Sequence, residues 1–109
     1  MFSKTSIEEL AHVLTEPYKH LELGQVNDHA VYVVRFIGEF PFHRHTQDEL
    51  YFVIDGVVKL EFTNLTPITL KKNESTVVRA YTTHKCYSEG AVVLLFKPKE
   101  MIASPADIE

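Results

Sequence analysis

Seven short segments rich in β-branched and aromatic residues, separated by turn residues, constrain the fold of this chain more than any other feature. The segments are 18–23, 30–37, 49–54, 57–63, 67–70, 76–79 and 91–96. Turn-forming residues fill the gaps, as at Asn27-Asp28, Asp55-Gly56 and Lys72-Asn73. Segments of this length and composition are typical of β-strands. Seven of them in one chain predict an all-β barrel or sandwich.

One helix is expected, and it precedes the strands. Apolar residues recur there at the spacing of a single helical face, at Ile7, Leu10, Ala11 and Leu14. Ser6 and Glu9 form a capping box at the start, and Pro17 prevents continuation at the end. The pattern predicts a helix over about 6–15 that packs its apolar stripe on the outside of the barrel.

Length, charge and cysteine content limit the class of protein. The chain has 109 residues, enough for one core, and a formal net charge of −4. Its scattered lysines form no basic cluster, so no nucleic-acid partner is expected. No apolar run of membrane-spanning length and no signal-peptide pattern occurs, and the single cysteine forms no internal disulfide. We expect a cytoplasmic protein with no membrane partner and a single domain over 1–109, comprising the helix, a barrel over about 18–98 and a C-terminal tail over 99–109.

Two closely spaced histidines are the first candidate for chemistry. His43 and His45 are two residues apart, so on a strand both imidazoles point to one face. Glu49 follows after a short polar turn, and a hairpin at this turn is expected to bring its carboxylate beside the pair. His84 is distant in sequence, as a closed barrel allows. Imidazole and carboxylate groups are ligands of divalent transition metals, so we predict a metal site with open positions.

The pattern His43-x-His45-x-x-x-Glu49, followed by six residues and Gly56, resembles the first conserved motif of the cupin superfamily. Gly38 precedes it, separated from His43 by four residues where the family usually has five. The stretch from Asn73 to His84 is similar to the second motif. Three of its positions depart from that motif, since Asn73, Arg79 and Tyr81 replace glycine, proline and glycine.

The resemblance covers roughly residues 26–98 and is to small single-domain cupins, often labelled mannose-6-phosphate-isomerase-like. It implies a double-stranded β-helix, or jelly-roll, barrel with the short α-helix at its N-terminal end. It also implies one divalent transition metal per chain, Fe, Zn, Ni or Mn, held by His43, His45, Glu49 and His84. A homodimer is expected as well. Its interface is expected to be a sheet face formed by four aliphatic residues that we take to point outward, Val31, Val33, Val58 and Leu60.

Strand parity gives a first view of the pocket around the ion. Tyr51 shares the face of Glu49, and Cys86 shares that of His84. Aromatic residues flank the ligand segments at Phe42, Tyr81 and Tyr87. Arg35 or Arg79 is a candidate to anchor an anionic substrate. The histidines outside the motif, His12, His20 and His29, are expected at the surface, and no catalytic residue is assigned.

The predicted function is that of a metal-binding cupin-domain protein whose barrel pocket takes a small molecule. Two enzyme classes fit it, a dioxygenase and a sugar isomerase. The alternative is a non-catalytic module that binds a small molecule. Because one fold of this type hosts many activities, the sequence leaves the choice open.

Overall fold

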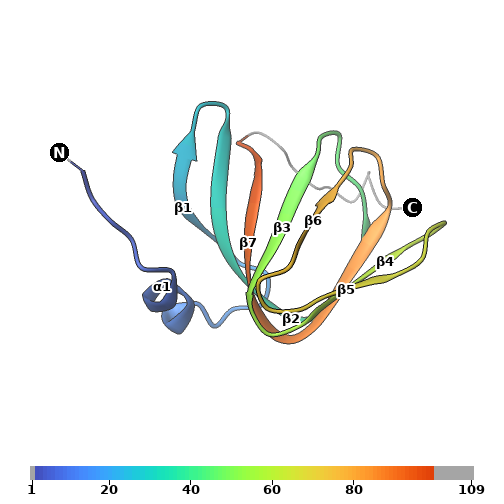
Figure 1. Cartoon of the computed structure of the whole chain (residues 1–109), viewed down its shortest axis with the longest axis horizontal. Coiled ribbons are helices and arrows are strands. Elements are labelled where there is room, and N and C mark those ends of the chain that lie inside the picture. The colour runs from blue at the N-terminus through green and yellow to red at the C-terminus, as the bar shows by residue number, and fades with distance from the viewer. Residues whose placement is uncertain (1, 100–109) are drawn as a thin grey trace.

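The computed structural model describes residues 2–99 of the chain. Within them the chain forms one helix and seven strands (Figure 1). Their bounds are α1 Ile7–Val13, β1 His20–Val26, β2 His29–His43, β3 Glu49–Asp55, β4 Val58–Phe62, β5 Ile68–Leu70, β6 Ser75–Val78 and β7 His84–Pro98. All strand pairs are antiparallel. The fold is the double-stranded β-helix that the sequence predicts. Most of the predicted tail, residues 100–109, lies outside the described residues.

Two long, bent strands, β2 and β7, organise the barrel. They pair with each other along nearly their whole lengths, from His29 opposite Pro98 to His43 opposite His84. The register slips near Gly38, which has a φ of 79°, and Gly90 on β7 has a φ of 147°. Glycine adopts these backbone angles without a Cβ clash, so both strands bend there.

The bend places different neighbours on the two halves of β7. Its first half pairs with β4, and its second half pairs with β3, which in turn pairs with β6. The sheet order is β1-β2-β7-β3-β6, with β4 and β5 joined through β7 (Figure 1). The predicted hairpin between the His43 strand and the Glu49 strand is therefore absent, because β3 pairs on the far side of β7. Glu49 still lies at the histidine end of the barrel, where its Oε1 atom is 3.7 Å from Nδ1 of His45.

The turn between β3 and β4 requires its glycine. Gly56 has a φ of 88°, and a Cβ at this position would lie 2.8 Å from the Cα atom of Ala91. This distance is shorter than a van der Waals contact. The motif glycine therefore lets the turn lie directly against β7.

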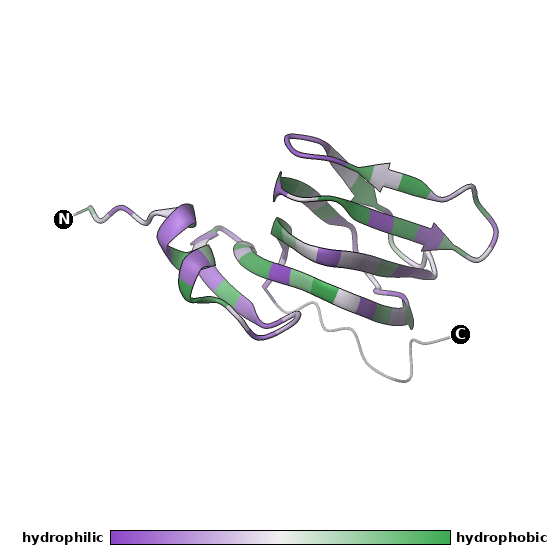
Figure 2. Ribbon diagram, turned by 90° about the horizontal axis from the view of Figure 1, so that it is seen from below, coloured by the Kyte–Doolittle hydropathy of each residue, from purple (hydrophilic) through white to green (hydrophobic). Residues whose placement is uncertain are grey.

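Alternating residues fill two separate apolar clusters. The residues that point into the barrel form the main core, with Val34, Phe36, Tyr51, Val53, Val58, Leu60, Leu70, Val78, Cys86, Ala91, Val93 and Leu95. The opposite face of the same sheet packs under α1, with Ala11, Leu14, Val33, Val92 and Leu94. Figure 2 shows the alternation of hydrophobic and hydrophilic residues along the strands. In the second half of β7 both faces are covered, which explains its continuous apolar run.

This packing corrects the predicted dimer face. Val33, Val58 and Leu60 are fully buried within the chain, and Val31 packs in the cluster beneath α1. Val33 is covered by the helix, while Val58 and Leu60 point into the barrel. Val33, Val58 and Leu60 therefore offer no surface to a second copy, and Val31 is only partly exposed.

Helix α1 begins as predicted and ends two residues earlier. The Ser6 hydroxyl accepts a hydrogen bond from the backbone N–H of Glu9 at 3.2 Å. The helix ends at Val13, well before Pro17. No helix within residues 2–99 has the length and apolar character needed to cross a membrane.

Candidate metal centre and pocket

Three buried histidines converge at one end of the barrel. His43 is the last residue of β2, His84 is the first residue of β7, and the two face each other in the register of these strands. Their ring centroids lie 4.3 Å apart, and the His45 ring lies 4.7 Å from that of His43. Each residue offers one nitrogen, and the three nitrogens lie within 4.8 Å of one another. This spacing suits ligands that share a single ion.

Strand parity predicts that His45 lies on the same strand as His43. In the structure His45 instead lies in the loop after β2. The loop is fixed by a hydrogen bond from the backbone N–H of Tyr81 to the carbonyl oxygen of His45, at 2.7 Å. Asp48 accepts a second bond, at 2.8 Å, from the backbone N–H of Ala80. These two bonds tie the loop before β3 to the turn before His84. The two ligand-bearing segments are thus held against each other.

Backbone carbonyls fix the orientation of two imidazoles. The Nδ1 atoms of His43 and His84 lie 2.8 Å from the carbonyl oxygens of Pro41 and Thr82, respectively. A carbonyl oxygen only accepts, so Nδ1 carries the proton, and Nε2 is the nitrogen that a neutral ring can offer to a metal. The pKa of His84 is lowered to about 4, chiefly by burial; the Thr82 carbonyl opposes this shift, and His43 and His45 add to it. His84 is therefore neutral at physiological pH, the state that binds a metal.

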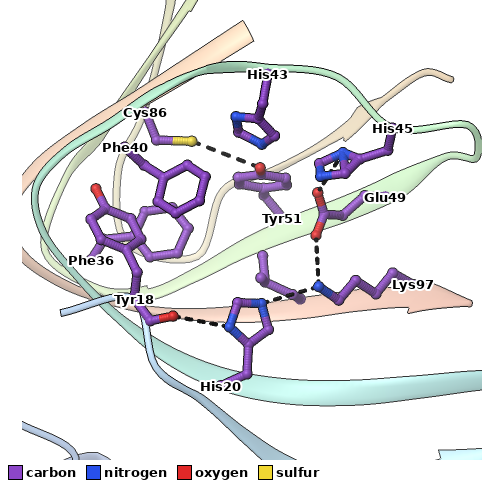
Figure 3. A pocket seen from close by; sticks show the side chains of 11 residues that line it. Tyr18, His20, Phe36, Phe40, His43, His45, Glu49, Tyr51, Cys86 and Lys97 are labelled. Atoms are coloured by element: carbon purple, nitrogen blue, oxygen red, sulfur yellow. Dashed lines mark hydrogen bonds and ion pairs between the residues drawn. The ribbon is translucent and has the colours of Figure 1, made fainter. Parts of the chain in front are cut away.

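The carboxylate of Glu49 lies beside the three histidines. It is the first residue of β3, and its side chain is only 3% exposed. Its Oε1 atom lies 3.7 Å from Nδ1 of His45 and, among the described residues, is buried without a hydrogen-bond partner (Figure 3). Burial raises the pKa of Glu49, and the charge of Lys97 opposes that rise. A buried oxygen without a partner costs free energy, and a cation would offset that cost.

A chain of hydrogen bonds supports the histidines from inside the barrel. The Tyr51 hydroxyl lies 3.3 Å from Nε2 of His84, and the thiol of Cys86 donates to the same hydroxyl at 3.7 Å. Burial raises the pKa of Tyr51 well above its ordinary value and that of Cys86 to about 12. Both groups therefore stay protonated, and Cys86 is not a reactive thiolate. The single lone pair on Nε2 of His84 can accept a hydrogen bond from Tyr51 or bind an ion, but not both.

A cavity of about 320 Å³ opens beside these residues (Figure 3). One side is polar, with His20, His43, His45, Glu49 and Lys97. The other side is mainly apolar and aromatic, with Tyr18, Phe36, Phe40, Tyr51 and Cys86, and Leu95 also lines the cavity. The volume suits a small molecule, and the division of the walls suits one with a polar end and an apolar body.

Of the pocket residues predicted from sequence, two line this cavity and four do not. Tyr51 and Cys86 are on its wall. Tyr81 and Tyr87 are 65% and 46% exposed, and Phe42 lies beside the ammonium group of Lys85. Tyr87 points outward because it alternates with Cys86, and Phe42 does so because it alternates with His43.

Arg35, the fourth of these residues, holds helix α1. Its guanidinium donates to the carbonyl oxygens of Ala11, Leu14 and Gly90, at 2.7, 2.9 and 3.3 Å. Arg79, the other candidate anchor, pairs at the surface with Asp48 at 3.2 Å. Neither arginine lines the cavity.

Lys97 and most of the aromatic wall are not identified by strand parity. A signal was present, because Lys97 shares the inward face of β7 with Val93 and Leu95, where a lysine is unusual. His20 is exposed, as expected, yet it also lines the cavity. Tyr18 and Phe40 could not be placed without knowing how the strands bend.

The chain is similar in sequence and structure to known proteins. It is 31% identical over 80 residues to the uncharacterized protein YdbB of Bacillus subtilis (strain 168), a match covering 72% of this chain and 71% of that protein. A cupin-2 domain containing protein from Shewanella frigidimarina NCIMB 400 superposes with a TM-score of 0.83 at 23% identity, over 87% of this chain and 94% of that one.

An enzyme structure also shares the fold. Hydroquinone 1,2-dioxygenase PnpCD, in complex with Cd²⁺ and 4-hydroxybenzonitrile, superposes with a TM-score of 0.75 at 21% identity, over 86% of this chain and 71% of that one. The family model described as "Cupin domain" matches residues 32–96, which include the whole histidine and glutamate group. With its barrel, its motif and this match, the chain belongs to the cupin family.

Proposed function

We propose that this protein binds one divalent transition metal and uses it to act on a small molecule held in the adjoining cavity. The observation that carries the proposal is the buried group of three imidazole nitrogens within 4.8 Å of one another. The ligands would be His43, His45 and His84, with Glu49 as the fourth. The buried Oε1 atom of Glu49, which lacks a hydrogen bond within the described chain, supports this assignment.

The donor set fits a transition metal. Imidazole suits iron, zinc and nickel, and the carboxylate extends the range to manganese, so the identity of the ion is left to measurement. A bound ion of this kind supplies Lewis-acid chemistry, and iron also supplies oxygen chemistry. The chain's own contribution is to hold His84 neutral by burial and to orient two of the imidazoles. The Pro41 and Thr82 carbonyls orient the rings through Nδ1 of His43 and His84.

The cavity wall favours a substrate with an apolar body over a sugar phosphate. Phe36, Phe40 and Leu95 offer no hydrogen bonds to sugar hydroxyls. The charged side chains that line it are a single lysine and Glu49, so no phosphate clamp is present among the lining residues. Between the two enzyme classes, this favours an oxygenase-type reaction over a sugar isomerase. The fold likeness to a dioxygenase whose structure holds Cd²⁺ and an aromatic nitrile is consistent with that choice.

The first test is metal analysis of untagged protein purified without metal-affinity resin. We expect close to one ion per chain in the wild type and in His12→Ala, which removes an exposed histidine of α1. His45→Ala should lose most of the ion. Absence of metal from the wild type, with none taken up on addition, would refute the proposal.

The distinction between an enzyme and a binding module needs a separate assay. Oxygen consumption by the iron-loaded protein, screened over small aromatic compounds, tests the oxygenase class. Ligand binding without turnover in that screen would favour the non-catalytic module. The cytoplasmic location and the homodimer stay predictions, and a stable monomer in sedimentation at micromolar concentration would contradict the homodimer.

A further inference from the structure

Lys97 is a largely buried lysine whose contacts within the described residues do not use all of its hydrogen-bond donors. It lies near the end of β7, on the polar wall of the cavity, with only 14% of its side chain exposed. Its Nζ atom is 3.8 Å from Oε2 of Glu49, which is longer than a hydrogen bond (Figure 3). It also lies 5.2 Å from the ring centroid of Tyr32. An ammonium group has three N–H donors, so these contacts leave donor capacity toward the cavity.

His20 holds Lys97 in place without neutralising it. The Nδ1 atom of His20 lies 3.0 Å from the carbonyl oxygen of Tyr18, so Nδ1 donates and Nε2 is left to accept. The Nζ atom of Lys97 lies 3.1 Å from that Nε2 atom. The bond is therefore one from a charged ammonium to a neutral imidazole. It fixes the direction of the ammonium group and leaves its charge in the cavity.

Metal binding would change the charge balance of this wall. In the metal-free chain, Glu49 and Lys97 are the oppositely charged residues of the lining. When Glu49 serves as a ligand, its charge is shared with the ion, and the cavity becomes net positive. A buried positive charge without a counter-charge is costly, so an anionic ligand is favoured.

We propose that Lys97, oriented by His20, is the anchor for the anionic end of the ligand, and that the ligand is a small monocarboxylate with an apolar body. The inference rests on the proposed metal-dependent function and names its substrate class. One lysine beside a neutral imidazole matches a single negative charge, whereas a phosphate dianion calls for several cationic donors. The apolar body lies against Phe36, Phe40 and Leu95.

Calorimetric titration with a matched pair of probes tests the anchor. The probes are 3-phenylpropanoate and its neutral amide, which share a body and differ in charge. We expect zinc-loaded wild type to bind the carboxylate at least about tenfold more tightly than the amide. Lys97→Met should weaken binding of the carboxylate far more than binding of the amide, so that the preference is lost, while Lys97→Arg should retain most of the preference. Lys59→Met, which removes a half-exposed lysine of β4, should behave as wild type.

The outcomes separate the anchor from the metal site. Metal content is measured for each variant, so that a loss of preference at full metal content is assigned to Lys97. Equal affinity of the wild type for the two probes, or an unchanged preference in Lys97→Met, would overturn the inference and leave the metal site standing.

If the wild type takes up no metal, the proposed function fails, and the anchor is tested by itself in metal-free Glu49→Gln. Lys97 then lacks its carboxylate neighbour, so this variant should still prefer 3-phenylpropanoate. Lack of preference there would overturn the anchor too. This variant leaves Lys97 itself unchanged, so the test does not depend on the stability of a Lys97 variant.

Discussion

At the scale of single residues, burial keeps the imidazole of His84 neutral. His84 has no exposed surface, donates through Nδ1 to a backbone carbonyl, and has its pKa lowered to about 4. In the unfolded chain an ordinary histidine titrates near 6.5. Between these two values the unfolded state therefore holds a proton at His84 that the folded state lacks. Stability must fall as the pH is lowered through this window.

We predict that metal-free wild type loses up to about 3 kcal/mol of unfolding free energy through His84 as the pH falls from 6.5 to about 4. Urea unfolding in the presence of a chelator measures it, with His84→Asn as the comparison. Burial raises the pKa of Glu49, so Glu49 contributes stability that increases as the pH falls. This contribution is present in both wild type and His84→Asn. The stability of wild type relative to His84→Asn should therefore decrease toward low pH.

The matched control is His29→Asn, which removes an exposed histidine at the start of β2. Its unfolding free energy should follow that of wild type across the same window. A constant difference between wild type and His84→Asn at all pH values would show that His84 is not held neutral by the fold.

Residue spacing predicted which side chains meet, and strand parity predicted part of what surrounds them. His43, His45, Glu49 and His84 lie together in the structure as the motif indicated. Strand parity does not predict the direction of a side chain that lies beyond the end of its strand, as His45 does, because β2 ends at His43. A wall residue such as Tyr18 comes from a segment whose path depends on tertiary packing, which a local pattern does not contain.

At the scale of elements, one arginine fastens the helix to the barrel. The Arg35 guanidinium reaches Ala11 and Leu14, whose carbonyls belong to the C-terminal end of α1. The last carbonyls of a helix have no partner within the helix, and a cation there also favours the helix dipole. The apolar stripe of α1 then covers Val33, Val92 and Leu94.

Replacing Arg35 by Met should destabilise the protein by about 2 to 3 kcal/mol, because three hydrogen bonds from a charged group are lost. Amide hydrogen exchange should accelerate most in Ile7–Val13. Arg79→Met is the control, since it removes an exposed ion pair and should cost less than about 1 kcal/mol. Equal effects of the two substitutions would mean that Arg35 does not hold the helix.

The helix and most strands were predictable from periodicity, while the lengths of β2 and β7 were not. The sequence indicated 30–37 and 91–96, yet the strands run over His29–His43 and His84–Pro98. Gly38 and Gly90 lie inside these strands, and in a local sequence pattern each glycine indicates the end of a strand. The structure uses their positive φ angles as bends, so pairing continues past each glycine.

At the scale of the whole molecule, the proposed metal site joins the ends of two consecutive strands, β2 and β3, to the start of β7, which is distant in sequence. Its residues come from the end of β2, the loop before β3, the start of β3 and the start of β7. The unfolded chain does not hold these groups together. An ion bound there therefore favours the folded state, by an amount that grows with its concentration relative to its dissociation constant.

We predict that zinc at about a hundred times its dissociation constant stabilises the protein by about 2.7 kcal/mol and raises Tm by about 10 °C or more. Differential scanning calorimetry with zinc, and again after adding excess chelator, measures the increment and its reversal. His45→Ala is the comparison, because it removes one imidazole at the loop and leaves β2, β3 and β7 intact. It should lose most of the increment. The same rise in both proteins would place zinc elsewhere on the chain, since a site built from this group depends on all three imidazoles at once.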